Sequence, residues 1–329
     1  MFQRRALHTL LKSLTAACLA APLAGWAQPP AYPSKPVKFI VPYAPGGLPD
    51  SIARVVAQKL GERLGQAVIV DNKPGGNGMV AYQNLLTSTP QDGHAFIVSD
   101  GSMLSITPLI NKSATYQVGK DLKPVSLIAR SPLFIVAHPN AHVSTMKEFV
   151  TLVKSKPDEF TYGSSGIGST HHLTMEALKH ALGLKIRHIP FRGSGQSTPA
   201  LVSGQVDFSV AALPSMMGYV SDKRVRLIAS NAATRSPQAP DIPAIAETVP
   251  GFDFAVVVGV LGAATTPQYA VDRISKEIAQ VVKDPDVLRN FNTAVIEPVG
   301  GSPADYERAI RKENEAMAKA GKIADLKTE

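Results

Sequence analysis

Two segments of this chain run from a strand through a glycine-rich turn straight into a helix, and this arrangement constrains the fold most. The first passes from strand Val37–Tyr43 through Ala44–Gly47 into an amphipathic helix, and the second passes through Phe160–Thr170 into a helix beginning near His171. The first N–H groups of a helix lack partners and carry partial positive charge, and glycine lets a ligand approach the backbone closely. Each junction therefore predicts a site for a carboxylate or phosphate. Two such junctions suggest one ligand held between two lobes.

The first junction belongs to a strand–helix–strand unit. Apolar residues recur at helical spacing between residues 52 and 64, Gly65 ends the helix, and Ala67–Val70 is the next strand. Such a unit predicts a parallel sheet with a right-handed crossover. Because ligands of open α/β sheets bind outside the carboxyl ends of the strands, the loops at 44–50, 72–78 and 99–104 should lie at one binding edge.

A second lobe is expected to repeat this pattern. The apolar segment 122–136, interrupted by Arg130-Ser131-Pro132, is interpreted as the strand that leaves the first lobe, and 254–261 as the return crossing. Helices at 267–282, 284–292 and 303–320 should pack back on the first lobe. The expected fold is an α/β clamshell of two lobes, each a mostly parallel sheet flanked by helices, joined by two crossing strands. Residues 28–130 and 254–329 form lobe 1, and residues 131–253 form lobe 2.

Residues 1–27 have the pattern of a cleaved signal peptide rather than of folded structure. Arg4, Arg5 and Lys12 precede an apolar stretch that ends in small residues, so Gln28 is the expected mature N-terminus in the periplasm. The stretch is shorter than the roughly 20 residues of a spanning helix, which argues against a membrane anchor. The pair Arg4-Arg5 leaves export by the general or the twin-arginine route open. Cys18, the only cysteine, lies inside this segment, and lipoprotein processing there is disfavoured by its surroundings.

Charge and motifs exclude several functions. The formal net charge is +8, and removing the three basic residues of the leader leaves +5. The basic residues are scattered along the chain and aromatic residues are few, which does not indicate nucleic-acid binding. Ser165 lacks the second glycine of a hydrolase elbow, because Ile167 stands there. Of the adjacent His171 and His172, at most one can face a site. No metal-ligand spacing occurs, and neither junction has the lysine of a nucleotide-binding loop. We therefore expect neither catalysis nor a metal or other cofactor.

Several motifs, taken in order, carry a resemblance to a known family. They are Tyr32-Pro33-Ser34-Lys35-Pro36-Val37, Val41–Gly47 with Asp50, Asp71–Gly75, Tyr162–Ser169 with His172-Leu173, Ile189–Ser194, Gly204–Asp207, Arg235–Pro237, Asp241–Pro243 with Glu247, and Pro250–Phe252. This ordered set resembles the Bug receptors, the periplasmic solute-binding proteins of tripartite tricarboxylate transporters. The resemblance covers most of the mature chain.

The resemblance implies a periplasmic-binding-protein clamshell that captures a small carboxylate and delivers it to the membrane components of such a transporter. It implies that the loops Tyr43–Asp50 and Gly163–Thr170 hold one ligand carboxylate, largely through backbone N–H groups and water. Ser102, Leu213 and Ser215 are added from topology, as residues that could contact the distal part of the ligand. The candidate ligand-binding residues are Tyr43, Ala44, Gly46, Gly47, Leu48, Asp50, Ser102, Ser164, Gly166, Ile167, Gly168, Ser169, Thr170, His172, Leu213 and Ser215. We expect a monomer.

One departure from the family pattern bears on the ligand. Family members often have threonine before the aspartate, where this chain has Leu48-Pro49-Asp50, and Ile167 adds a second aliphatic side chain. These residues suggest a ligand with an apolar body, such as an aromatic or long aliphatic acid, unless both merely pack on neighbouring loops. Rather than touching an anion directly, Asp50 would cap or neutralise the first helical turn, or bond a ligand hydroxyl or amine. A periplasmic enzyme acting on a carboxylic acid, or a sensory protein presenting a ligand to a membrane histidine kinase, remain the alternative functions.

Overall fold

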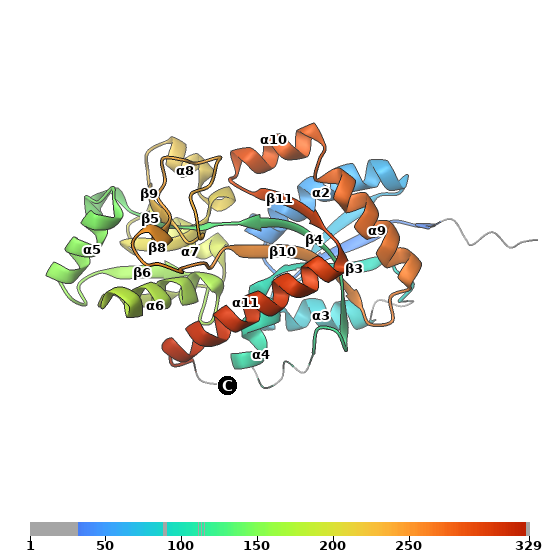
Figure 1. The fold of residues 1–329 in the computed structure, drawn as a ribbon, viewed down its shortest axis with the longest axis horizontal. Coiled ribbons are helices and arrows are strands. Elements are labelled where there is room, and N and C mark those ends of the chain that lie inside the picture. Colours follow the sequence, from blue (N-terminus) through green and yellow to red (C-terminus); the bar gives the residue numbers. More distant parts are fainter. Residues whose placement is uncertain (1–31, 88–90, 111, 113, 115, 327–329) are drawn as a thin grey trace, which may run out of the picture. The chain divides into compact units, whose positions relative to one another are not determined.

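The computed structural model describes residues 32–87, 91–110, 112, 114 and 116–326. The predicted leader, residues 1–27, lies outside them. Residues 35–329 form one compact unit. This unit contains two β-sheets, one of six strands and one of five, each flanked by helices (Figure 1).

The larger sheet contains the first strand–helix–strand unit. Strand β1 pairs in parallel with β2 and with β3, whereas β10 and β11 pair antiparallel with their neighbours. The strands lie in the order β11 (Glu297–Gly301), β4 (Leu122–Ser131), β10 (Val256–Ala263), β3 (Ala95–Asp100), β1 (Val37–Val41) and β2 (Val68–Asn72).

The smaller sheet repeats this combination. Strand β6 pairs in parallel with β7 and β8, and β5 pairs antiparallel with β8 and β9. The order is β7 (Arg187–Pro190), β6 (Thr161–Ser164), β8 (Phe208–Ala212), β5 (Leu133–Ala137) and β9 (Arg226–Ser230). The two-lobed α/β fold is confirmed, but both sheets are mixed rather than mostly parallel. The crossing strands β10, β4 and β5 enter the sheets in the antiparallel sense, which the strand–helix–strand pattern could not reveal.

Both predicted crossings are present. Strand β4 ends in the larger sheet at Ser131, Pro132 interrupts the ladder, and β5 begins the smaller sheet at Leu133. The chain returns after β9 through residues 231–255 and enters β10 of the larger sheet. Proline cannot donate a ladder hydrogen bond, so it separates one apolar run into two strands.

Helices flank both sheets, and α2 (Leu48–Leu64) ends where the sequence predicts. Helix α2 begins with Pro49 in its first turn and ends at Gly65, which adopts φ 67° as a left-handed C-cap. The larger sheet is also flanked by α3 (Met79–Thr87), α4 (Thr107–Ile110), α9 (Gln268–Val281), α10 (Pro285–Thr293) and α11 (Pro303–Ile323), in addition to α2. The smaller sheet is flanked by α5 (Met146–Ser155), α6 (Thr170–Leu182), α7 (Ser194–Val202) and α8 (Met217–Ser221). Short helical turns are η1 (Gly76–Gly78), η2 (Ser102–Ile106), η3 (Pro139–Ala141), η4 (Leu213–Ser215) and η5 (Ile245–Glu247).

Two features depart from the sequence-based expectation. Strand β11 was not predicted, and it pairs with β4 despite containing Pro298 and two glycines. Helix α11 contacts β4 and η2, as expected for a helix on the first lobe, but it also contacts α6 beside the smaller sheet (Figure 1). The C-terminal helix therefore joins elements of both sheets.

Candidate functional site

The first predicted junction lies at the carboxyl ends of β1, β2 and β3. Asn72, the last residue of β2, donates hydrogen bonds to the carbonyl of Tyr43 (3.0 Å) and to Asp50 Oδ1 (2.9 Å). Ala44 and the following glycines form the turn between these anchored residues. Asn72 was part of a motif in the sequence, but its role in holding the turn was not predicted. Its position at the end of a strand in the same parallel unit was the available signal.

Asp50 is the anchor of this turn. Its carboxylate, 2% exposed, accepts hydrogen bonds from the Gly46 N–H (2.9 Å), Arg54 Nε (3.1 Å) and Asn72. Burial alone would raise the pKa of Asp50, but the hydrogen bonds from Arg54, Gly46 and Asn72 outweigh it and the pKa is lowered. Both oxygens are therefore occupied, which favours capping of the turn over a bond to a ligand hydroxyl or amine.

The internal hydrogen bonds of this turn leave fewer backbone N–H groups free to bind a ligand. The Gly46 N–H donates to the Asp50 carboxylate, and the Ser51 N–H donates to the Gly47 carbonyl at 3.0 Å. Within the described chain, the N–H groups of Gly47, Leu48 and Asp50 have no acceptor, and Pro49 has no N–H. Three donors at the start of α2 thus remain for a ligand.

The second junction, residues 164–170, is closed by internal hydrogen bonds. Ser164 Oγ accepts from the Gly166 N–H (3.1 Å), and Ser169 Oγ donates to the Gly166 carbonyl (2.7 Å) while capping α6 by accepting from the His172 N–H (3.2 Å). The Gly168 N–H donates to His172 Nδ1 at 3.2 Å. The predicted residue His172 therefore faces its own loop.

Three other donors of this loop remain. In the described structure the backbone N–H groups of Ser165, Ile167 and His171 have no acceptor. Gly166 and Gly168 adopt φ of 126° and 74°, a region that favours glycine and that lets the chain turn between these donors. The second junction thus mirrors the first, with backbone donors rather than charged side chains at a helix start.

Residues from the two sheets meet at this point. Ser102 Oγ, in η2 after β3, lies 3.0 Å from Thr170 Oγ1 at the start of α6, and the Thr170 N–H points to the same Ser102 oxygen at 3.4 Å. Helix α2 also contacts η4, which contains Leu213 and Ser215. The structure therefore brings together predicted loops from both sheets. The Ser215 hydroxyl itself donates to the Ala212 carbonyl (2.8 Å).

A buried acid that was not predicted lies behind the first junction. Asp100 Oδ1 accepts hydrogen bonds from the Tyr43 hydroxyl and from the Ser102 N–H. Burial raises the pKa of Asp100, although the Tyr43 and Ser102 bonds oppose this rise. Burial and the charge of Asp100 raise the pKa of Tyr43 well above its usual value. Tyr43 therefore stays a neutral donor that positions the loop through Asp100.

Leu48 and Ile167, on which the hypothesis of a ligand with an apolar body rests, differ in exposure. Leu48 is 5% exposed, which agrees with packing, whereas Ile167 is 57% exposed and is one of the large exposed apolar side chains. Ile167 is the only one of the two that offers an apolar surface to solvent. A ligand with an apolar body would therefore find its apolar contact at Ile167 rather than at Leu48.

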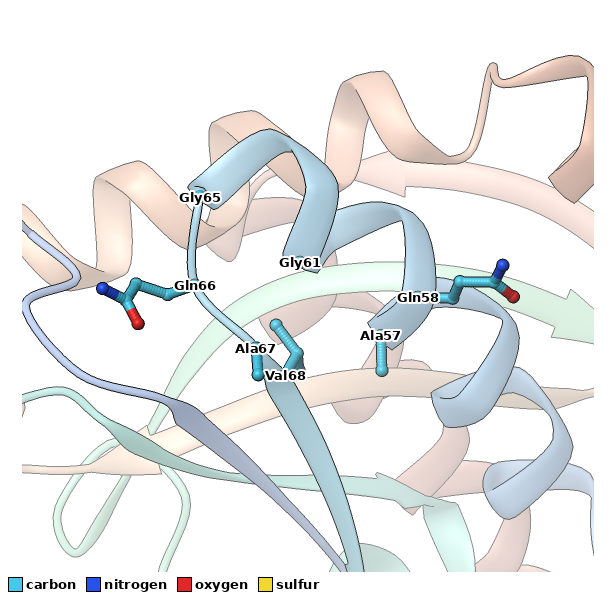
Figure 2. A pocket seen from close by; sticks show the side chains of 7 residues that line it. All are labelled: Ala57, Gln58, Gly61, Gly65, Gln66, Ala67 and Val68. Carbon is cyan, nitrogen blue, oxygen red and sulfur yellow. The ribbon is translucent and has the colours of Figure 1, made fainter.

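A surface hollow of about 410 Å³ lies elsewhere, between the last turn of α2 and the start of β2 (Figure 2). Ala57, Ala67 and Val68 line it, and Gly61 lets the helix approach the backbone of residues 66–68 closely. At a rise of about 1.5 Å per residue, Gly65 is roughly 25 Å from the start of α2. The hollow therefore lies at the opposite end of the helix from the candidate site.

Among the described residues, no group of three or more His, Cys, Asp or Glu side chains could hold a metal ion. No helix within this described part of the chain is both long and apolar enough to cross a membrane.

The family comparison agrees with this geometry. Residues 52–326 match the family described as the tripartite tricarboxylate transporter family receptor. The chain belongs to this family. A UPF0065 protein of Bordetella bronchiseptica is 30% identical to the receptor over 331 residues, which cover 99% of this chain and 98% of that protein.

Solved structures show the same fold. The R. palustris protein Rpa4515 with adipate is 29% identical, with a TM-score of 0.86, over 91% of this chain and 100% of the other. The periplasmic binding protein BugD is 26% identical, with a TM-score of 0.82, over 91% and 100%. The predicted relationship to the Bug receptors is confirmed. The family consists of periplasmic solute-binding receptors rather than enzymes, which excludes the alternative of an enzyme acting on a carboxylic acid.

Proposed function

We propose that this receptor captures a small carboxylate between its two lobes and delivers it to the membrane components of a tripartite tricarboxylate transporter. The observation that carries the proposal is the pair of helix starts with unpaired backbone donors, three N–H groups at α2 and three at the 164–171 loop. The Ser102–Thr170 contact brings the loop after β3 in the larger sheet against the second of these helix starts. Each hydrogen bond to a charged group contributes about 1.5–3 kcal/mol. Three or four such hydrogen bonds would supply much of the roughly 8 kcal/mol of binding free energy that a micromolar affinity requires.

The proposed ligand is a dicarboxylate with an apolar body. The candidate residues include no lysine or arginine, so neutral dipoles hold the anion, and the exposed Ile167 offers an apolar contact for the rest of the molecule. The similar R. palustris protein was solved with adipate, an aliphatic diacid. A compact hydroxylated acid such as citrate would present polar groups, its hydroxyl and its third carboxylate, to the Ile167 side chain, with loss of their hydration.

We further propose that residues 28–130 with 254–329 and residues 131–253 move as two lobes about the crossings at Pro132 and at 231–255. Only the closed form lets both helix starts contact one ligand, so the ligand favours closure through its differential affinity for that form. The membrane components would then recognise the closed receptor. Residues 1–27 are proposed to be removed on export, so that the mature chain begins at Gln28.

The test is calorimetry on purified residues 28–329 with adipate, phthalate and citrate. We expect micromolar binding of adipate or phthalate and at least tenfold weaker binding of citrate. Tighter binding of citrate would overturn the ligand class, and absence of binding for all carboxylates would overturn the receptor site. The transporter partner is tested by uptake of the bound acid in a strain lacking this gene, which should fall and should return with the gene.

A further inference from the structure

Two histidines stack beneath the 164–170 loop. The rings of His172 and His188 lie 4.1 Å apart with an interplanar angle of 17°, and His188 stacks in turn on Tyr162 at 4.8 Å and 20°. His172 comes from the first turn of α6, and His188 comes from β7, the neighbour of β6. The stack therefore connects the strand before the loop, the helix after it and the adjacent strand.

Each imidazole holds one part of the loop. His188 Nε2 lies 2.6 Å from Ser164 Oγ, the fully buried hydroxyl that also bonds Gly166. His172 Nδ1 accepts the Gly168 N–H, so this nitrogen carries no proton and the ring N–H is on Nε2. The contacts fix Gly166 and Gly168, which are the residues on either side of Ile167.

Both rings are neutral in this environment. Burial lowers the pKa of His188 to about 3, with further contributions from His172 and Lys179. Burial also lowers the pKa of His172, against the opposing effect of Glu176, with Lys179 adding to the decrease. Tyr162 donates to Glu176 Oε1, and Lys179 pairs with the same carboxylate, so the charges around the stack are already matched. A proton on His172 Nδ1 would place two N–H donors against each other.

We propose that His188 is a positioning residue of the ligand site. Stacked on His172, it holds Ser164 while His172 holds Gly168, and together they set the direction of the Ser165 and Ile167 N–H groups. This inference deepens the proposed function, since it assigns a support for the same loop. It does not require His188 to touch the ligand.

The experiment compares three variants of residues 28–329. His188→Phe keeps an aromatic ring in the stack but loses the nitrogen, His188→Gln restores a hydrogen-bonding group, and His180→Phe removes an exposed histidine from α6 as the control. Each variant is measured for adipate affinity by calorimetry, for melting temperature, and for hydrogen exchange of the Gly166 and Gly168 amides by NMR without ligand.

We expect His188→Phe to weaken adipate binding about tenfold and to accelerate exchange of both amides about tenfold, as for the loss of one supporting hydrogen bond. His188→Gln should recover part of both effects, and His180→Phe should match the parent. Ser164→Ala should have effects at least as large as those of His188→Phe, because it also removes the bond to Gly166. The double variant should be no worse than Ser164→Ala alone, because His188 acts through the Ser164 hydroxyl.

Unchanged affinity and exchange in both His188→Phe and Ser164→Ala would overturn the proposal. The proposal would also be overturned if the losses of adipate affinity and amide protection simply followed the decrease in melting temperature and were not recovered in His188→Gln. If the parent protein fails to bind adipate, the proposed ligand fails, while amide exchange still decides the positioning role. A His188→Phe protein that does not fold is replaced by Ser164→Ala, with the same expectations.

Discussion

Ser102 Oγ and Thr170 Oγ1 lie 3.0 Å apart and join a loop of the larger sheet to the first turn of a helix beside the smaller sheet. Ser102 follows β3, and its N–H bonds Asp100, which also accepts from Tyr43. Thr170 follows the Ser169 cap of α6. This hydroxyl pair therefore joins the loop after β3 to the Gly163–Thr170 loop, and Asp100 links it to Tyr43 at the start of the other predicted ligand loop.

The first prediction concerns this contact. Ser102→Ala and Thr170→Val each remove one hydroxyl from the junction of the lobes, so the closed form and its contacts with ligand should become less stable. We expect each to weaken adipate binding by about 0.5–1.5 kcal/mol, and the pair together to weaken it by less than the sum. Calorimetry measures the affinities. Ser221→Ala, on an exposed position of α8, is the control and should leave binding unchanged. Fully additive losses would mean that the two hydroxyls act independently.

The second prediction separates two glycines of the site. Gly47 adopts φ −77°, and a Cβ there would meet only the Ala44 carbonyl, at 3.8 Å. Gly47→Leu should therefore keep the melting temperature without ligand and lose at least tenfold in adipate affinity, because the side chain occupies the approach to the α2 donors. Gly168 adopts φ 74°, so Gly168→Ala should cost about 1–2 kcal/mol of stability as well as affinity.

A matched control exists at the far end of α2. Gly65 adopts φ 67°, and a Cβ there would meet no atom within 4 Å, so Gly65→Ala should carry the same backbone strain as Gly168→Ala. It should lower the melting temperature by a similar amount and leave adipate affinity unchanged. A loss of binding in Gly65→Ala would show that general destabilisation, rather than the site, controls affinity.

The sequence predicted the elements whose signals are local. Gly65 ends α2 as expected, and Pro132 divides the crossing segment into β4 and β5. It did not predict β11, because Pro298, Gly300 and Gly301 have low strand propensity and only pairing with β4 makes this segment a strand. The mixed sense of the sheets was missed for the same reason, since antiparallel pairing of the crossing strands depends on contacts distant in sequence.

The positions of the ligand loops were also predictable, but the fate of their donors was not. Glycine turns at strand ends indicated Gly46 and Gly168, yet Asp50 takes the Gly46 N–H and His172 takes the Gly168 N–H. These bonds depend on side-chain rotamers that a residue pattern does not contain. His188 supports Ser164 from 24 positions away in the sequence, across a pair of parallel strands. The residues proposed to bind the ligand stay predictions.

The third prediction concerns the carboxylate of Asp50. Asp50→Asn keeps an acceptor for the Gly46 N–H but loses the charge that pairs with Arg54, whose side chain is half exposed. We expect a loss of about 1 kcal/mol in the free energy of unfolding at pH 7. Because the pKa of Asp50 is lowered in the folded state, its contribution is present above the unfolded value of about 3.8 and is lost as pH falls through the folded value.

Urea denaturation at pH 7 and pH 3 checks this prediction. The stability difference between Asp50→Asn and the parent protein should shrink at pH 3, where the aspartate is increasingly protonated. Asp222→Asn, an exposed position after α8, should differ little from the parent at either pH. A difference that stays constant between the two pH values would assign the effect to side-chain geometry rather than to charge.

The last prediction concerns stability in mild acid. His171 lies next to Thr170, and both nitrogens of its ring are buried without a hydrogen-bond partner among the described residues. Burial lowers its pKa to about 4 from 6.5. Between these values the unfolded chain binds a proton that the folded protein does not, so stability falls as pH decreases from about 6.5 to about 4. One such group contributes about 3 kcal/mol of this loss.

His171→Phe removes this proton and keeps an aromatic ring. Its free energy of unfolding, measured by urea denaturation from pH 7 to pH 4, should therefore fall by about 3 kcal/mol less than that of the parent protein. His180→Phe, at an exposed position of the same helix, should follow the parent, because no buried imidazole is removed. Parallel curves for His171→Phe and the parent would show that His171 binds its proton equally well in the folded and unfolded chains. Its nitrogens would then reach water or another partner in solution.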